Sequence, residues 1–191
     1  MKYLAFIERS IARHGYVKPE YAPHLAIMME ELEGQHPYQI ARAFRQTGTP
    51  LSKEAKKLLG LRANADMTEE ATSALTQKGL SSPLKGLEVT LLDASFDYFR
   101  RRAAAEVNRP EFEGYASLFV DSWNKDCLGC SRMKGQKIEL DDLDQIPPSD
   151  CANEACNMTV RLHMDFTRQA LDRDRADAKA RKSFVSRVLG R

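Results

Sequence analysis

The sequence predicts a mainly α-helical protein that carries a small β appendage and ends in a charged helix. Apolar residues recur at helical spacing, between glycine and proline boundaries, through the first 107 residues. Alternation typical of strands occurs around two close pairs of cysteines, and a run of mixed charges follows them. A chain of 191 residues, 42% of them hydrophobic, is long enough for one main core and a smaller satellite. We therefore expect a helical domain over residues 1–124, a small module over 125–166 and a charged C-terminal arm over 167–191.

Five short helices are expected in the first 80 residues. In the first of them Leu4, Ile7 and Ile11 fall three or four residues apart, which places them on one helix face. Proline suits the first turn of a helix and glycine commonly follows the last turn, so these residues set the expected boundaries. The expected helices cover residues 4–14, 23–32, 37–47, 52–59 and 68–78.

The longest helix is expected from Pro83 to Val107. Ser82 is a suitable N-cap, and the apolar positions that follow form a face broad enough to be buried as the central helix of the fold. At about 1.5 Å per residue this helix would span roughly 36 Å. After a break at residues 108–110, a further helix over about 112–123 is expected to lead into the first cysteine pair.

Two close cysteine pairs form a metal-binding signature. Cys127 and Cys130 are a C-x2-C unit, and twenty residues separate them from the C-x4-C unit of Cys151 and Cys156. A C-x2-C turn lets two thiolates face one ion while backbone amides point at the sulfurs, and a second pair completes a tetrahedron. Four thiolates select zinc or iron and leave no open position for a substrate. The sequence therefore predicts one structural Zn²⁺ held by all four cysteines, in a zinc-ribbon-like module joined to the helical domain at Trp123.

Two short strands are expected to frame this site. Residues 137–140 alternate between polar and apolar side chains, and so do residues 158–166. We expect these two segments to pair with each other, with residues 141–148 as a loop between them that proline keeps out of any strand. A module this small buries little apolar area, so its fold is expected to depend on the metal.

Three other roles for the cysteines stay open. Two disulfides are disfavoured because the N-terminal residues carry charges where an export signal needs an apolar stretch. A redox C-x2-C needs a helix N-terminus in a βαβ setting, whereas the expected flanks are a helix and a strand. An iron–sulfur cluster is compatible with the same four ligands. His163 could replace one cysteine, but its place on the polar face of a strand favours a solvated side chain.

Basic residues at two places are candidate contacts to a partner protein or a nucleic acid. The formal net charge is only +2, so any basic surface must be local. The C-terminal arm mixes both signs and ends in a small apolar stripe, which is typical of a surface helix stabilised by i,i+4 pairs or of a docking arm. The candidate contact residues are Arg100, Arg101 and Arg102 near the end of the central helix, and Arg181, Lys182 and Arg187 in the arm.

Catalytic signatures are absent from the sequence. It contains no glycine-rich phosphate loop, no H-E-x-x-H zinc motif and no G-x-S-x-G nucleophile elbow. No apolar run approaches the roughly 18 to 20 residues that a membrane span needs. We therefore expect no enzyme activity, small-molecule substrate or membrane association, and a cytoplasmic protein that works in an oligomer or a larger assembly.

Residues 101–156 resemble part of a known family. The run Arg101-Arg-Ala-Ala-Ala-Glu106, the Trp123-Asn-Lys-Asp126 segment before the first cysteine, and Pro147-Pro148 before the second pair are similar to the C-terminal part of the phage Mu minor head protein family, which acts in head morphogenesis. The second cysteine pair departs from the family pattern, which has His-Pro and a tight Cys-x-Cys there. The resemblance implies a virion component beside the portal or capsid, able to contact packaged DNA, in the host cytoplasm or the virion.

Three functions remain open from the sequence. The first is a structural or assembly protein in which the zinc module and the C-terminal arm make subunit contacts. The second is a zinc-ribbon regulator that binds nucleic acid, and the third is a redox protein built on Cys127 and Cys130. The closed four-thiolate shell and the charged arm favour the first.

Overall fold

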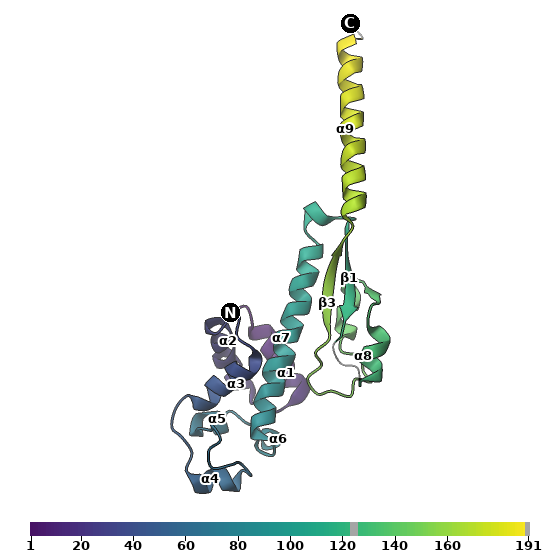
Figure 1. Ribbon diagram of the computed structural model, residues 1–191. Helices are drawn as coiled ribbons and strands as arrows, with labels where there is room; N and C mark the ends of the chain where they lie inside the picture. Colours follow the sequence, from purple (N-terminus) through teal and green to yellow (C-terminus); the bar gives the residue numbers. More distant parts are fainter. Residues whose placement is uncertain (123–125, 190–191) are drawn as a thin grey trace.

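The protein is divided by one long central helix into a helical body and a smaller sheet module. The computed structural model describes residues 1–122 and 126–189, with side chains as far as residue 179. Figure 1 shows the short N-terminal helices on one side of the central helix α7, a small sheet on the other side, and the C-terminal helix α9 extending away from both. The mainly helical fold, the small antiparallel sheet beside the cysteines and the C-terminal helix agree with the sequence prediction.

The helical body follows the expected boundaries closely. Gly15 ends the first helix in the left-handed conformation, with φ at 64°, as its position in the sequence predicts. The single helix expected over 68–78 is wrong: Thr76 starts a second helix there by accepting a hydrogen bond from the backbone N–H of Gly79 at 3.1 Å. The elements are α1 (Leu4–His14), η1 (Pro19–Tyr21), α2 (Ala22–Glu31), α3 (Pro37–Gln46), α4 (Lys53–Leu58), α5 (Glu69–Ser73) and α6 (Gln77–Leu80).

An apolar core holds the body together. Ile7 of α1, Leu25 of α2 and Phe44 of α3 are fully or almost fully buried and belong to one cluster with Leu87 and Leu91 of α7. Burying a side chain of this size stabilises a fold by about 1.5–3 kcal/mol. The body therefore has a conventional core of its own, distinct from the cysteine cluster.

Helix α7 (Pro83–Val107) has the boundaries that the sequence predicts and packs on both sides. Its 25 residues span about 37 Å at 1.5 Å per residue. Leu87, Leu91 and Ala94 join the core of the body, while Ala104, further along, joins the core of the sheet module. Because α7 contributes buried side chains to both cores, it is the element that fixes the module relative to the body.

The sheet contains three antiparallel strands in the order β2-β1-β3. They are β1 (Ala116–Asp121), β2 (Lys137–Ile138) and β3 (Thr159–Met164), and the short turn η2 (Pro110–Phe112) precedes β1. The helix expected over 112–123 is therefore wrong, and so is the pairing of the second and third strands with each other, because both pair with β1. The central strand itself lies before residue 125, within the range expected for the helical domain. Trp123, the expected junction, lies outside the described residues.

One face of the sheet is buried and the other is open to solvent. Leu118 and Val120 of β1 and Ile138 of β2 point into a core that α7 and the cysteines complete. Lys137 and Arg161 are exposed on the opposite face. Between β1 and β3 the chain forms α8 (Leu128–Met133) and η3 (Leu140–Gln145), so part of the expected 141–148 loop is a 3-10 helix.

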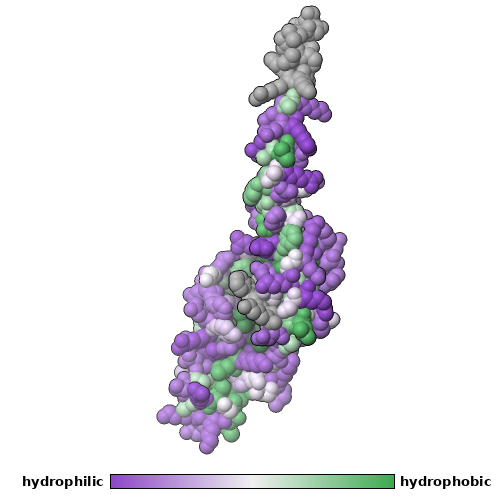
Figure 2. Space-filling view, turned by 45° about the vertical axis from the view of Figure 1, so that its right-hand side comes forward, coloured by the Kyte–Doolittle hydropathy of each residue, from purple (hydrophilic) through white to green (hydrophobic). Residues whose placement is uncertain are grey.

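Helix α9 (Phe166–Leu189) forms an arm that leaves the rest of the molecule. It is anchored at its base, where the hydroxyl of Tyr115 donates to Asp172 Oδ2 at 3.3 Å. Along the described part of the arm, the side chains are mostly hydrophilic, with apolar patches near the base (Figure 2). Phe166 and Leu171 are 67% and 53% exposed there. None of the described helices combines the length and apolar character required to cross a membrane.

Candidate metal centre

The four cysteines meet on the buried side of the sheet. Cys127 is the N-cap of α8 and Cys130 lies in its first turn, while Cys151 and Cys156 lie in the loop between η3 and β3. The Sγ atom of Cys130 is 3.5 Å from that of Cys151 and 3.4 Å from that of Cys156, and the Sγ atoms of Cys127 and Cys151 are 3.8 Å apart. The fold thus brings together two sequence pairs separated by twenty residues.

These distances fit a metal shell. Tetrahedral zinc binds thiolates at about 2.3 Å, which places neighbouring sulfurs about 3.8 Å apart, whereas a disulfide holds them at about 2.0 Å. All four cysteines are free. The Sγ atoms of Cys127, Cys130 and Cys151 lie within 4.8 Å of one another, and Cys156 joins them through Cys130. The four clustered cysteines are therefore consistent with binding a metal such as Zn²⁺.

The cluster contains one acidic thiol and two that resist ionisation. Hydrogen bonds from the backbone N–H groups of Cys130 and Ala152 lower the pKa of Cys127 to about 7. Burial raises the pKa of Cys130, and the neighbouring thiols raise it further. Burial likewise raises the pKa of Cys156, against a backbone hydrogen bond from Met158. A divalent cation bound by these sulfurs would deprotonate them, so metal binding at this cluster is expected to release protons.

Close contact between the two cysteine loops depends on a small residue in α8. A Cβ atom at Gly129 would lie 2.6 Å from Asp150 Oδ1 and 3.2 Å from Pro148 Cγ. The absence of a side chain lets the second loop approach the helix directly above Cys130. Arg132 then pairs with Asp150 at 3.1 Å on the outer side. Neither contact could be inferred from spacing alone, because both join α8 to a loop that lies almost twenty residues further along the chain.

The second cysteine loop also contacts the helical body. Glu154, between Cys151 and Cys156, accepts a hydrogen bond from the hydroxyl of Tyr16 at 2.8 Å and forms an ion pair with Lys85 at 2.8 Å. These partners lower the pKa of Glu154, the lysine more than the tyrosine. The loop that carries half of the cluster is therefore fastened to the body, which sequence reasoning missed.

The three adjacent arginines of α7 have three different environments. Arg100 is 1% exposed and donates from NH1 to the backbone oxygen of Met158 at 2.9 Å, so its expected contact with a nucleic acid or partner is wrong. Arg101 pairs with Asp97 at 3.3 Å and with Asp144. Arg102 is exposed, so its expected contact with a partner protein or a nucleic acid stays a prediction. The side chains of the candidate contacts in the arm, Arg181, Lys182 and Arg187, lie outside the described residues.

The flanks of the C-x2-C unit differ from the expected ones. A strand precedes it and a helix follows it, so the expected absence of a helix N-terminus, which counted against a redox role, is wrong. The surrounding sheet is antiparallel and Cys130 lies within 3.5 Å of both thiols of the second pair, an arrangement that favours four-fold ligation over a two-thiol redox site. His163 is exposed on β3, with its ring 5.6 Å from that of Phe119, as expected for a solvated side chain.

Comparisons with protein-family models, curated proteins and solved structures find no match to this chain. The functional conclusions that follow depend on the geometry of its own residues.

Proposed function

We propose that this protein is a structural assembly subunit in which one Zn²⁺, bound by Cys127, Cys130, Cys151 and Cys156, fixes the sheet module against α7. The supporting observation is the cluster of four free thiols, with neighbouring sulfurs 3.4 to 3.8 Å apart. Four thiolates saturate tetrahedral zinc, so the metal has no position for a substrate and acts by holding shape. The small apolar core of the module makes such a metal necessary for its fold.

Metal analysis of the purified full-length chain tests the zinc site. We expect one zinc per chain in the wild type and a loss of most of it in Cys130→Ser, whose Sγ is the sulfur closest to two other thiols. Leu128→Ser is the matched control, because Leu128 lies in the same helix and is 86% exposed. Zinc content in Cys130→Ser equal to that of the wild type would contradict the assignment.

The arm supports the assembly part of the proposal. Isolated helices are marginally stable in water, since tertiary packing supplies most of the stability of a helix in a protein. Among the described residues of α9, the ion pairs of Asp172 with Arg168 and Arg175 are local, and Phe166 and Leu171 are exposed. A subunit surface that covers these apolar side chains would stabilise the arm. A place in a phage particle, beside a portal or capsid, is the form of this proposal that the motifs of residues 101–156 suggest.

Light scattering on the eluting full-length protein tests the assembly. We expect a mass above that of one chain and a shift toward the monomer in Leu171→Glu, which places a charge on the exposed apolar side of the arm. Ala176→Glu, exposed and on a different side of the same helix, is the control. A wild-type protein that is monomeric at all concentrations and purifies without a partner would contradict the assembly role.

The open face of the sheet favours nucleic-acid binding as a second candidate function. Phe119 at its centre is directly opposite Lys137 on one side and Arg161 on the other. An aromatic ring between basic side chains suits a single strand, whose bases stack while its phosphates pair with the cations. Anisotropy with a fluorescent oligothymidylate should show binding that weakens with salt, and Arg161→Glu should weaken it further than the distant exposed control Lys53→Glu. Equal binding by the two variants would remove this candidate.

A further inference from the structure

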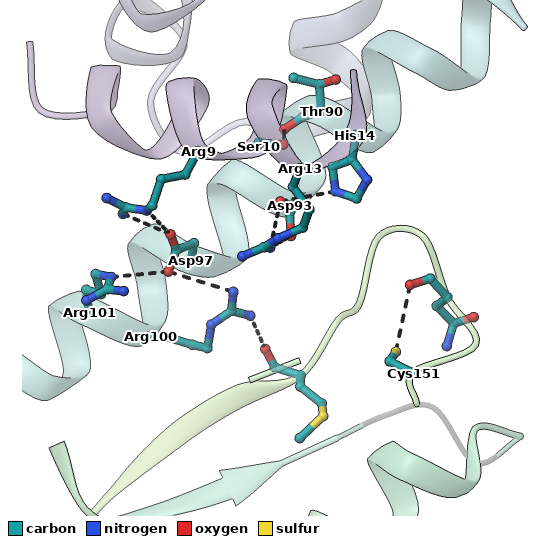
Figure 3. Close-up of polar contacts among 12 residues, drawn as sticks. Arg9, Ser10, Arg13, His14, Thr90, Asp93, Asp97, Arg100, Arg101 and Cys151 are labelled. Carbon is teal, nitrogen blue, oxygen red and sulfur yellow. Dashed lines mark hydrogen bonds and ion pairs between the residues drawn. The ribbon is translucent and has the colours of Figure 1, made fainter. Parts of the chain in front are cut away.

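Arg100 is a buried cation whose charge is incompletely paired. It lies on α7, and its NH1 donates to the backbone oxygen of Met158 at 2.9 Å. Its NH2 has no hydrogen-bond partner among the described residues, and the nearest carboxylate oxygen, Asp97 Oδ1, is 3.8 Å away. Figure 3 shows the guanidinium between Asp97 and the start of the strand that follows the cysteine loop. Because a buried charge is costly without a partner, this arrangement calls for a further anion.

The carboxylates around Arg100 are already shared with other arginines. Asp97 pairs with Arg9 at 2.9 Å and with Arg101 at 3.3 Å, in addition to Arg100. Asp93, the other buried carboxylate of α7, pairs with Arg13 at 2.7 Å. Within the described residues, the network around Asp97 holds three arginines, Arg9, Arg100 and Arg101, against two aspartates, Asp97 and Asp144. Asp93 pairs separately with Arg13 and His14.

The cysteine cluster lies on the other side of Arg100. Met158, which accepts the hydrogen bond from Arg100, directs its own backbone N–H at the sulfur of Cys156 two residues earlier. Cys156 is 1% exposed and its Sγ is 3.4 Å from that of Cys130. Burial lowers the pKa of Arg100, and the nearby Asp97, Asp93 and Cys156 oppose this change. Met158 therefore connects the two groups, because its oxygen accepts from Arg100 and its N–H is directed at the sulfur of Cys156.

Zinc bound by four thiolates has an excess of negative charge. The ion contributes two positive charges and the sulfurs four negative ones, so the centre attracts a cation even after the metal is bound. An arginine remains charged in any protein environment and can stay buried while it fulfils this role. Arg100 is the innermost cation of the network described above, on the side of α7 that faces the sheet.

We infer that Arg100 is a positioning residue for the zinc centre: it fixes Met158, whose N–H is directed at Cys156, and its charge offsets part of the excess negative charge of the four thiolates. This inference rests on the proposed zinc site and extends it to α7. Through Asp97 and Arg9 the same network continues to α1, so the metal centre is linked to the helical body by a chain of charged contacts.

Zinc affinity of full-length variants, measured by competition with a chromophoric chelator, tests this role. We expect Arg100→Met, which keeps an unbranched stem but removes the guanidinium with its charge and its donors, to bind zinc about 10- to 100-fold more weakly than the wild type. Arg100→Lys, which keeps the charge, should recover most of the loss. Arg102→Met is the matched control, because Arg102 is the exposed neighbour on the same helix, and its affinity should not change. Arg100→Gln replaces the methionine variant if the latter does not fold.

The absorption spectrum of the Co²⁺-loaded variants distinguishes a loss of affinity caused by the missing charge from one caused by disruption of the metal site. Arg100→Met should keep the thiolate–cobalt bands of a tetrahedral site while its affinity falls. An affinity of Arg100→Met equal to that of the wild type, or a lysine variant that binds no better than the methionine variant, would overturn the inference while leaving the zinc site in place. A wild-type chain that binds neither metal would instead overturn the proposed zinc site itself.

Discussion

The helical body and the sheet module pack on the same helix, but they are closed by different kinds of residue. The body is filled by apolar side chains from several helices, such as Ile7, Leu25 and Phe44. The core of the module has fewer apolar residues, and Cys127, Cys130 and Cys156 lie within it. The difference teaches that a region too small to bury enough apolar area can use its core for metal ligands, and that its fold then depends on metal as well as on burial.

Removing the metal should have the largest effect, and the effect should be confined to one region. Structural zinc sites contribute about 10 kcal/mol or more to the folding of small modules, because binding and folding are coupled. We expect a strong chelator to abolish hydrogen-exchange protection in β1, α8 and β3, while α1 to α3 stay protected. Hydrogen exchange followed by mass spectrometry measures the protection of each segment separately. Loss of protection in both regions together would show that the body has no independent stability.

The reverse experiment removes an apolar side chain from the body. Phe44 is 2% exposed in the core of the body, and truncation of such a residue costs about 3–5 kcal/mol. Phe44→Ala should therefore lower the free energy of unfolding of the body, measured by urea titration, while one zinc per chain remains bound. Phe99→Ala, at a site 49% exposed on α7, should have a much smaller effect. A zinc content that falls in Phe44→Ala would contradict the separation of the two cores.

The features that sequence predicts here are those determined by neighbouring residues. Gly15 ends α1 and Pro83 begins α7 because glycine and proline act on their own backbone. The two cysteine units were identified for the same reason, since C-x2-C and C-x4-C spacing is local. Aromatic residues at positions 112, 115 and 119, before and within β1, imitate helical spacing, and because Phe119 lies between Leu118 and Val120 the strand shows no clear alternation of polar and apolar residues.

The features that sequence could not predict are contacts between distant segments. Tyr16 and Glu154 are 138 positions apart, and Arg100 and Met158 are 58 positions apart. A run of three arginines has the same appearance whether one of them points into the protein or all are solvated. The direction of Arg100 depends on where β3 packs against α7, which is set by tertiary structure and not by the arginines themselves.

The ion pairs between α1 and α7 should make the stability of the helical body depend on pH. Burial alone would raise the pKa of Asp93, but His14, whose Nε2 lies 3.2 Å from Asp93 Oδ2, and the charge of Arg13 outweigh it and lower the pKa. A carboxyl whose pKa is lower in the folded state contributes stability above its unfolded pKa of about 3.9, and this contribution is lost as pH falls through the folded pKa. Asp93→Asn should lower the free energy of unfolding by about 2 kcal/mol near neutral pH. The difference in this free energy between the variant and the wild type should narrow below pH about 4. Urea titrations of both proteins across this pH range measure the difference. A difference that does not change with pH would contradict the role of the Asp93 charge.

The smallest expected effect concerns the contact that joins the two regions through the cysteine loop. Tyr16→Phe removes only the hydroxyl that donates to Glu154 at 2.8 Å, while the ring keeps its packing against Gly86. Since Glu154 is partly solvated, we expect Tyr16→Phe to lower the free energy of unfolding by only about 0.5–1 kcal/mol. A double-mutant cycle with Glu154→Ala, measured by urea titration, isolates this contact, and Tyr38→Phe at a site 50% exposed is the control. If the loop is fastened to the body by this contact, the two substitutions will be non-additive in the zinc-loaded protein and additive once the chelator has removed the metal. Equal coupling in both states would mean that the loop stays docked without the metal, and that the module depends on zinc less than the composition of its core indicates.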